Sequence, residues 1–255
     1  MTSDLKICLN ADIGELPGPN GRALDRALLD IVTRCSVACG GHAGDTESME
    51  ATLKAADARN VLVGAHPSYP DVENFGRKSL KMAMGDLRTA VVSQVRTLKA
   101  IARDKGVSIT HLKPHGALYV DAAQQQEYAE MMVNIAIQLD IPLLIGPPRS
   151  YMQKVAKQMN FPFLIEAFAD RTYNSNGTLA PRDEVGAVIE DDNEAVAQTL
   201  QIVTRQQVTA RDGKVLDMKV DTLCLHGDSP GAVSTAFAVR QGLLAHRVTI
   251  EAISK

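Results

Sequence analysis

The 255-residue chain lacks tryptophan, and aromatic residues make up only 4% of it. This composition suits aliphatic packing between helices and parallel strands. Its four cysteines, Cys8, Cys35, Cys39 and Cys224, show neither CxxC nor zinc-ribbon spacing, so we expect free thiols in a reducing compartment. No apolar run approaches the roughly 18 residues of a membrane span, and the first four residues lack the form of a signal peptide. We therefore expect a cytoplasmic protein.

Other absences exclude whole classes of function. The net charge is -3 and no basic cluster occurs, which argues against nucleic-acid binding. The chain has no P-loop and no GxGxxG fingerprint, and it lacks the HExxH zinc helix and the GxSxG nucleophile elbow. Nucleotide-binding domains of the P-loop and GxGxxG types, and serine hydrolases with a GxSxG elbow, are therefore not expected.

What the chain does have is a repeated unit, an apolar run followed by a polar, glycine-flanked cluster and then a helical pattern. The clusters lie at 10–15, 40–45, 64–68, 111–116 and 226–228. Strand, polar tip and helix in alternation are typical of a β/α barrel, which gathers functional groups at the C-terminal ends of its strands. We predict one domain over residues 1–255, a TIM-like α/β barrel of about seven strands.

The sequence also predicts three local elements. Apolar spacing predicts a helix over 23–34, and a second helix is expected over 86–105, ended by Gly106. Asp212 and Gly213, at the centre of 208–220, predict a β-hairpin.

The polar clusters supply catalytic chemistry. Side chains two residues apart share a face of a strand, so we expect Asp12, Lys113, His115 and His226 to converge at the barrel mouth. Imidazoles, carboxylates and a lysine together can perform acid–base catalysis near neutral pH. These four residues are our catalytic candidates.

Neighbouring residues in the same clusters are candidates for substrate binding. Arg171 has a planar fork that matches a carboxylate, although pairing with Asp170 is a competing interpretation. His111 lies deeper in its strand and is expected to be structural, and Glu15 could face solvent. The substrate-binding candidates are Asn10, His42, His66, Arg77, Arg171 and Asp228.

The same mixture of side chains can hold a divalent metal, which takes two or three histidines and carboxylates with an open position for water. Asp12, His42 and His115 are the ligands that the sequence suggests.

Seven motifs occur in an order that resembles the LamB/YcsF family, to which the A component of bacterial 5-oxoprolinase belongs. They are LNADIGE (9–15), ACGGHAGD (38–45), GAHPS (64–68), FGR (75–77), KPHGALY (113–119), FADRTY (168–173) and LHGD (225–228). The resemblance covers nearly the whole chain. It implies a barrel related to those of the polysaccharide deacetylases and glycoside hydrolases.

The resemblance also implies a reaction and partners. Family members open 5-oxoproline to L-glutamate with ATP hydrolysis, and they work with separate 5-oxoprolinase subunits B and C. Opening a lactam needs a base, an oxyanion stabiliser and an acid. Asp12, His115 and His226 are then candidates for base and acid, and Lys113 for stabilising the oxyanion or a phosphorylated intermediate.

The resemblance does not say which component binds ATP. Without a P-loop, ATP could be bound with or by the partners, although Gly40, Gly41 and Gly44 could form an anion-binding nest before a helix that Asp45 could cap. Two rival functions remain open. One is a metal-dependent deacetylase or amidohydrolase acting on an N-acyl substrate, and the other is a non-catalytic substrate-binding component.

Overall fold

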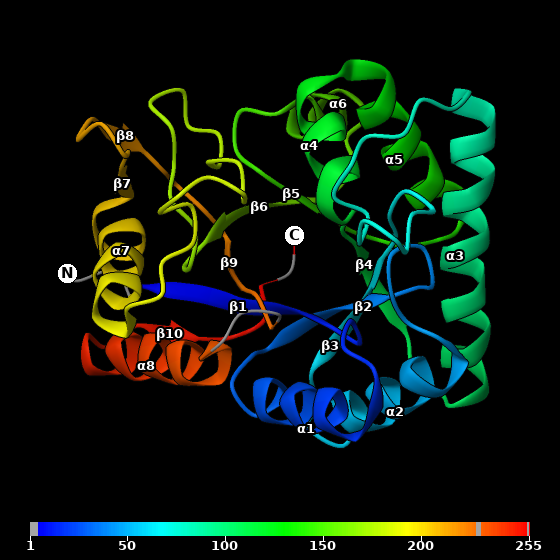
Figure 1. Ribbon diagram of the computed structural model, residues 1–255, viewed down its shortest axis with the longest axis horizontal. Coiled ribbons are helices and arrows are strands. Elements are labelled where there is room, and N and C mark those ends of the chain that lie inside the picture. The colour runs from blue at the N-terminus through cyan, green and yellow to red at the C-terminus, as the bar shows by residue number, and fades with distance from the viewer. Residues whose placement is uncertain (1–4, 228–230, 254) are drawn as a thin grey trace.

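Seven parallel strands form a closed barrel in the computed structural model, which describes residues 5–227, 231–253 and 255 (Figure 1). The barrel closes because β1 pairs with β9 as well as with β2. In the order in which they pair, the strands are β1 (Lys6–Ile13), β2 (Arg34–Ala38), β3 (Leu62–His66), β4 (Ile109–Leu112), β5 (Leu144–Gly146), β6 (Phe163–Phe168) and β9 (Thr222–Leu225). The prediction of a barrel of about seven strands is confirmed.

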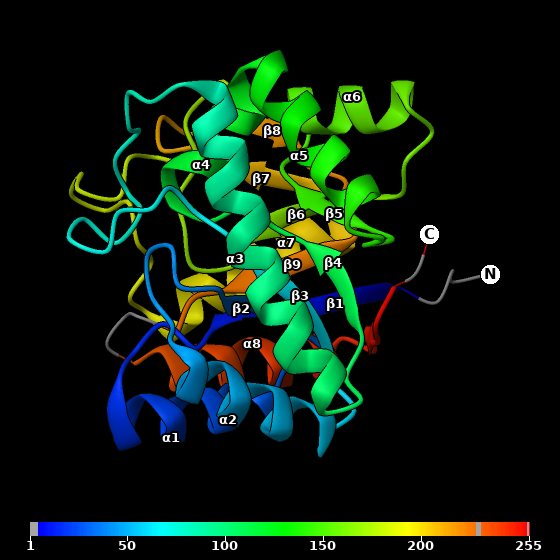
Figure 2. The ribbon, with the colours of Figure 1, turned by 90° about the vertical axis from the view of Figure 1, so that its right-hand side faces the viewer.

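Helices surround the barrel, and each packs against at least one other helix (Figures 1 and 2). They are α1 (Gly18–Leu29), α2 (Thr46–Asp57), α3 (Met84–Asp104), α4 (Gly116–Gln124), α5 (Gln126–Gln138), α6 (Tyr151–Gln158), α7 (Asp192–Arg205) and α8 (Ala232–Ala245). Because helices cover the outside and side chains fill the inside, every residue of β1 after Lys6 is buried. This double burial explains the apolar runs of the sequence.

Three short strands lie outside the barrel. β7 (Gln207–Thr209) and β8 (Val215–Asp217) form an antiparallel pair, as the hairpin prediction required. β10 (Thr249–Ile250) runs parallel to the start of β1, so segments from the two ends of the chain lie side by side (Figure 2).

The two helix predictions have different outcomes. Helix α3 and the following Gly106, which has φ +72°, confirm the second one. The first was wrong in its bounds, because α1 already ends at Leu29 and Arg34 begins β2. The apolar residues Ile31 and Val32 continue the helical spacing, but they are buried in the turn between helix and strand.

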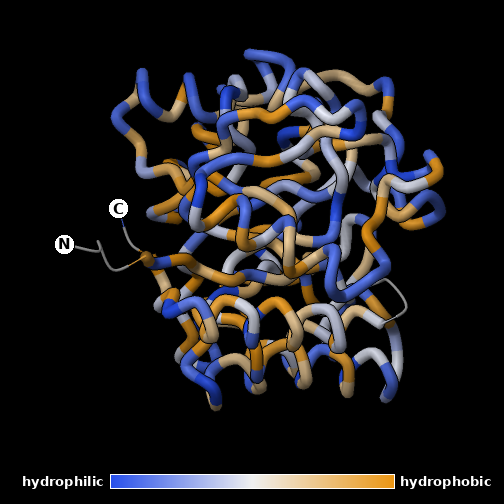
Figure 3. The backbone as a smooth tube through the Cα atoms, turned by 90° about the vertical axis from the view of Figure 1, so that its left-hand side faces the viewer, coloured by the Kyte–Doolittle hydropathy of each residue, from blue (hydrophilic) through white to orange (hydrophobic). Residues whose placement is uncertain are grey.

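Hydropathy alternates along the outer helices, as Figure 3 shows for the helices at the lower edge of that view. This alternation is the amphipathic pattern of helices that cover a core. Within the described residues, no helix is both long enough and apolar enough to cross a membrane.

Candidate active site

The candidate side chains gather at the C-terminal ends of six barrel strands, where such folds place their active sites. Most of them are buried, and His226 is half-buried. They lie on or after β1 (Asn10, Asp12, Glu15), β2 (His42), β3 (His66), β4 (Lys113, His115), β6 (Glu166, Asp170) and β9 (Cys224, His226).

Lys113 is the centre of a buried ion-pair group. Its Nζ lies 2.6 Å from Asp12 Oδ1 and 3.1 Å from Glu166 Oε1. The same atom lies 3.2 Å from Asn10 Oδ1 and 3.2 Å from Cys224 Sγ. An ammonium group has three hydrogens to donate, and these neighbours occupy them all. We refer to these five residues as the lysine group.

Charge pairing decides the protonation state of the lysine group. Burial alone would lower the pKa of Lys113, but the charges of Asp12, Cys224 and Glu166 outweigh it and hold that pKa well above its usual value. Burial would raise the pKa of Asp12, yet His66 and Lys113 hold it well below its usual value. The group therefore contains an ammonium and a carboxylate at neutral pH. In this conformation Lys113 positions Asp12 and has no free hydrogen for an oxyanion.

His226 forms a dyad with Asp170. The backbone N–H of His226 donates to Asp170 Oδ2 at 3.0 Å, and its Nδ1 lies 3.0 Å from both carboxylate oxygens. Its ring stacks on Phe168, with the centroids 5.3 Å apart. Burial would lower the pKa of His226, but Asp170 raises it above the usual value. Asp170 thus fixes the ring and leaves Nε2 as the nitrogen that can exchange protons.

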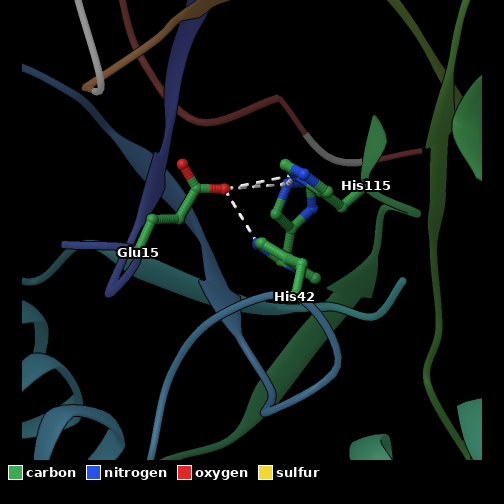
Figure 4. Close-up of side chains that lie close together, drawn as sticks. Glu15, His42 and His115 are labelled. Carbon is green, nitrogen blue, oxygen red and sulfur yellow. Dashed lines mark hydrogen bonds and ion pairs between the residues drawn. The ribbon is translucent and has the colours of Figure 1, made fainter. Parts of the chain in front are cut away.

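A second group consists of Glu15, His42, His66 and His115, which we call the histidine group. Glu15 Oε1 lies 3.0 Å from His42 Nε2, 3.2 Å from His115 Nδ1 and 3.8 Å from His66 Nε2. The rings of His42 and His115 stack in parallel 3.6 Å apart, and Glu15 points at their edges (Figure 4).

The carboxylate and the histidines shift each other's pKa values. Burial would raise the pKa of Glu15, but its hydrogen bonds with His115 and His42 hold it well below the usual range. Burial lowers the pKa of His42 to about 4, against the opposing hydrogen bond to Glu15. Glu15 is therefore a carboxylate and His42 a neutral imidazole near pH 7.

The segment between β3 and α3 covers the histidine group. Phe75 packs edge-on against both His42 and His115, with centroid distances of 5.2 and 5.4 Å. Gly76 follows with φ +62°, and a Cβ there would lie 2.9 Å from His42 Cβ and 3.1 Å from the His115 ring. Only glycine brings the chain this close to the stacked rings.

The arginine candidates lie toward the rim. Arg171 donates from Nε to Ala187 O and from Nη2 to Ala180 O, so it does not pair with Asp170 through a hydrogen bond but holds the excursion after β6. Burial lowers the pKa of Arg171, and the charges of Arg182 and Arg77 lower it further. The guanidinium of Arg171 therefore lies within electrostatic reach of both Arg182 and Arg77.

Other predicted residues have simpler places. His111 is fully buried and contacts Arg34 and Ser36 inside the barrel, as expected of a structural histidine. Asp228 lies outside the described residues. Asp45 accepts a hydrogen bond from the backbone N–H of Ser48 and caps α2, so its carboxylate occupies the N-terminus of the helix that follows Gly40, Gly41 and Gly44.

Sequence reasoning missed three residues of the site. Glu15 is 9% exposed and does not face solvent. Glu166 is a carboxylate within the apolar run of β6, which was the signal that could have revealed it. Asp170 was considered only as a partner of Arg171, yet it binds His226.

Two sets of side chains have atoms placed for a metal ion. One is the complete histidine group, and the other comprises Asp12, Cys224 and His226; within each set the ligand atoms lie within 4.8 Å of one another. The geometry groups Glu15, in place of Asp12, with His42 and His115. Asp12 borders the histidine group, since its Oδ2 lies 3.3 Å from His66 Nε2.

Fold and site together define a β/α-barrel protein with acid–base groups at the strand ends. The chain belongs to the LamB/YcsF family, whose sequence pattern matches residues 7–255.

Relatives are similar over nearly their full length. A protein of Methylococcus capsulatus, named as the A component of 5-oxoprolinase, is 43% identical over 248 residues, covering 97% of this chain and 95% of that protein. A protein of the same name from Chloroflexus aggregans is 41% identical, covering 96% of this chain and 98% of that protein. The crystal structure of a lactam utilization protein from Thermus thermophilus superposes with a TM-score of 0.88 at 33% identity, covering 98% and 100% of the two chains.

Proposed function

We propose that this chain is the A component of an ATP-hydrolysing 5-oxoprolinase, which opens 5-oxoproline to L-glutamate. The observation that carries the proposal is the identity of about two residues in five, over nearly the full length, to proteins named for that activity. The lactam utilization protein of Thermus thermophilus, with the same fold, points to the same class of cyclic amide.

The reaction needs a group that moves protons. Water adds to the ring carbonyl and loses a proton, and the ring nitrogen must gain one as the C–N bond breaks. His226 suits both steps, because Asp170 holds its Nδ1 and leaves Nε2 for the proton. Asp12, with its lowered pKa, is a weak base and is better suited to orienting the attacking water. The role of His115 as acid or base stays a prediction.

The substrate carries a carboxylate, and the arginine rim offers matching charge. The charges of Arg182 and Arg77 both act on Arg171, which gives this region a local positive field. We propose that Arg77 and Arg171 attract the carboxylate of 5-oxoproline, while Asn10, His42 and His66 contribute polar contacts beneath it.

ATP coupling is assigned to an assembly. The sequence has no P-loop, and the carboxylate of Asp45 occupies the N-terminus of α2, which weakens the case for a phosphate site at that helix. The relatives are named as one component of a multi-subunit enzyme, so we infer partner chains of the B and C type that bind ATP or complete its site.

The test is an assay of glutamate release from 5-oxoproline with ATP, run on this chain alone, on the partner subunits alone and on the reconstituted assembly. The proposal predicts release only from the complete assembly. Stoichiometric release by the purified chain alone would place ATP coupling in this chain. No release from any combination would contradict the proposed function.

The histidine group favours one second candidate, a metal-dependent amidohydrolase or deacetylase acting on an N-acyl substrate. Release of acetate from N-acetyl sugars by the single chain, lost after chelation, would support it. A purely substrate-binding role predicts instead that the assembly keeps its rate when His226 is replaced.

A further inference from the structure

The hydrogen bonds of the histidine group fix where its protons are. His66 Nδ1 lies 2.8 Å from the carbonyl oxygen of Lys113, and His115 Nε2 lies 2.9 Å from the carbonyl oxygen of Phe75. A carbonyl oxygen only accepts, so each of these nitrogens must carry the hydrogen. In a neutral imidazole the other nitrogen is then a bare acceptor. Both histidines therefore direct an acceptor nitrogen to the interior of the group.

Those two inward nitrogens face each other. His66 Nε2 and His115 Nδ1 are only 3.0 Å apart. Glu15 Oε1 lies 3.2 Å from the second of them, and Asp12 Oδ2 lies 3.3 Å from the first. Acceptors in van der Waals contact repel unless a positive charge lies among them. Lys113, the nearby buried cation, already donates its hydrogens to the lysine group.

The outer contacts of both rings match those of metal-bound histidines. A ligating imidazole usually donates its second N–H to a backbone carbonyl or a carboxylate, which fixes its tautomer. Phe75 supplies one such carbonyl from a backbone with φ +54°, a left-handed conformation that is costly for an aromatic residue. The strained turn is thus the element that orients His115. His42 differs, because its Nδ1 finds no hydrogen-bond partner among the described residues.

The spacing also fits a small cation. Bonds of about 2.0–2.2 Å to a tetrahedral ion place neighbouring ligand atoms about 3.3–3.6 Å apart. The separations around Glu15 Oε1 and between His66 and His115 run from 3.0 to 3.8 Å, and all four ligand atoms lie within 4.8 Å of one another. Because the rings of His42 and His115 stack in parallel, binding would tilt these two rings toward the ion. Three imidazoles and one carboxylate form a ligand set of intermediate softness, which suits zinc and similar divalent ions better than magnesium or calcium.

We propose that Glu15, His42, His66 and His115 bind one divalent transition-metal ion, with zinc the best match. The site does not depend on the proposed function, because metal binding is measured without turnover. A bound ion would neutralise the facing acceptors and cross-link four segments of the barrel mouth. As a Lewis acid it would polarise a carbonyl placed against it.

The test is titration of the chelator-treated chain with zinc and with cobalt(II), by calorimetry and by the visible absorption of tetrahedral cobalt. The expected result is one ion per chain, with affinity lowered about a hundredfold or more in Glu15→Gln and in His115→Ala. His246→Ala, which removes an exposed histidine, is the matched control and should bind like the wild type. His226→Asn tests the neighbouring set of Asp12, Cys224 and His226, and it should also retain binding.

Thermal unfolding separates loss of ligand from loss of fold. With chelator present, Glu15→Gln and wild type should both unfold cooperatively, and only the wild type should gain stability on adding zinc. The proposal is overturned if the wild type binds neither ion, because a shared proton would then satisfy the facing nitrogens. It is equally overturned if binding survives in Glu15→Gln and His115→Ala but is lost in His226→Asn.

Discussion

Two buried polar groups share the mouth of this barrel, and they solve the problem of burial differently. In the lysine group every hydrogen of one ammonium meets an acceptor, with Asp12 and Glu166 as the charged partners. In the histidine group the acceptors outnumber the donors, and two imidazole nitrogens face each other at 3.0 Å. The cation of the first group is Lys113 itself, whereas the cation that we propose for the second group comes from outside the chain.

This difference assigns a structural role to the lysine group and a ligand-binding role to the histidine group. The buried ammonium of Lys113 donates to Asn10, Glu166 and Cys224, which holds these neighbours in place and leaves no donor for a substrate. An incomplete group has spare binding capacity and therefore suits a ligand. The Asp170–His226 dyad lies between these extremes, since one ring nitrogen is held and the other is left for proton transfer.

The largest effect is expected at the dyad. Replacing His226 with Asn should lower glutamate release by the assembly by about a hundredfold to ten-thousandfold, because the proton-transfer group is lost. Steady-state rates of the reconstituted enzyme measure it, with circular dichroism as the check on folding. Asp170→Asn should lower the rate in the same direction, because the tautomer is no longer fixed. A wild-type rate in His226→Asn would remove the dyad from the mechanism.

The second-largest effect is expected from disrupting the lysine group. Lys113→Met leaves the carboxylates of Asp12 and Glu166 buried without a cation, and we expect a loss of about 3–5 kcal/mol in the free energy of unfolding. Urea denaturation provides the measurement. If Lys113→Met unfolded at the same urea concentration as the wild type, the group would not be the support described above. A double variant, Lys113→Met with Glu166→Gln, should recover part of the loss.

Asp25, a buried carboxylate outside both groups, sharpens the comparison. Asp25 has a backbone N–H of Gly14 as its partner at 3.2 Å, and burial raises its pKa to about 6, with the charge of Glu15 raising it and that of Arg26 lowering it. The folded pKa lies above the unfolded value of about 3.8. Between these values the unfolded chain releases a proton that the folded chain retains. The contribution of Asp25 to the free energy of unfolding is therefore fully present at low pH. It is lost as the pH rises through about 4 to 6, by up to about 3 kcal/mol.

Asp25→Asn should remove that loss while keeping an acceptor for Gly14. As the pH rises from about 4 to about 8, the free energy of unfolding of the variant should therefore increase relative to that of the wild type, as measured by urea denaturation. A difference that stays constant across this range would mean that Asp25 ionises normally.

The smallest effect is expected where a lysine pair is exposed. Lys6 Nζ lies 2.7 Å from Glu251 Oε1, close to the Lys113–Asp12 distance, but both side chains are about half exposed. Lys6→Met should change the free energy of unfolding by less than about 1 kcal/mol, since solvent screens the pair. It is the matched control for Lys113→Met. Equal losses in the two variants would show that burial is not what makes the lysine group strong.

The sequence was sufficient for the fold, because strand, polar cluster and helix alternate with little ambiguity. It failed at the end of α1, where Ile31 and Val32 keep the helical spacing although the chain has already turned toward β2. Apolar spacing does not show where a helix ends, because a buried turn can continue the spacing of the helix before it.

The site was predictable only as far as strand alternation extends. Asn10, Asp12 and Lys113 converge as their two-residue spacing suggested. Glu15 follows Gly14, whose φ of +78° turns the chain where the alternation of β1 ends. No periodic pattern predicts the direction of a side chain after such a turn. Asp170 and His226 lie 56 positions apart and follow β6 and β9, and their contact depends on the pairing of these two strands, which no local pattern predicts.

The most direct test of the contrast between the two groups is anomalous X-ray scattering at the zinc absorption edge, from crystals grown with one equivalent of zinc. The account predicts a single peak among Glu15, His42, His66 and His115, with bonds of about 2.0–2.2 Å to a Glu15 oxygen and to the inward imidazole nitrogens. Lys113 should keep its contacts with Asp12 and Glu166. A peak between Asp12, Cys224 and His226, or no peak at the barrel mouth, would contradict it.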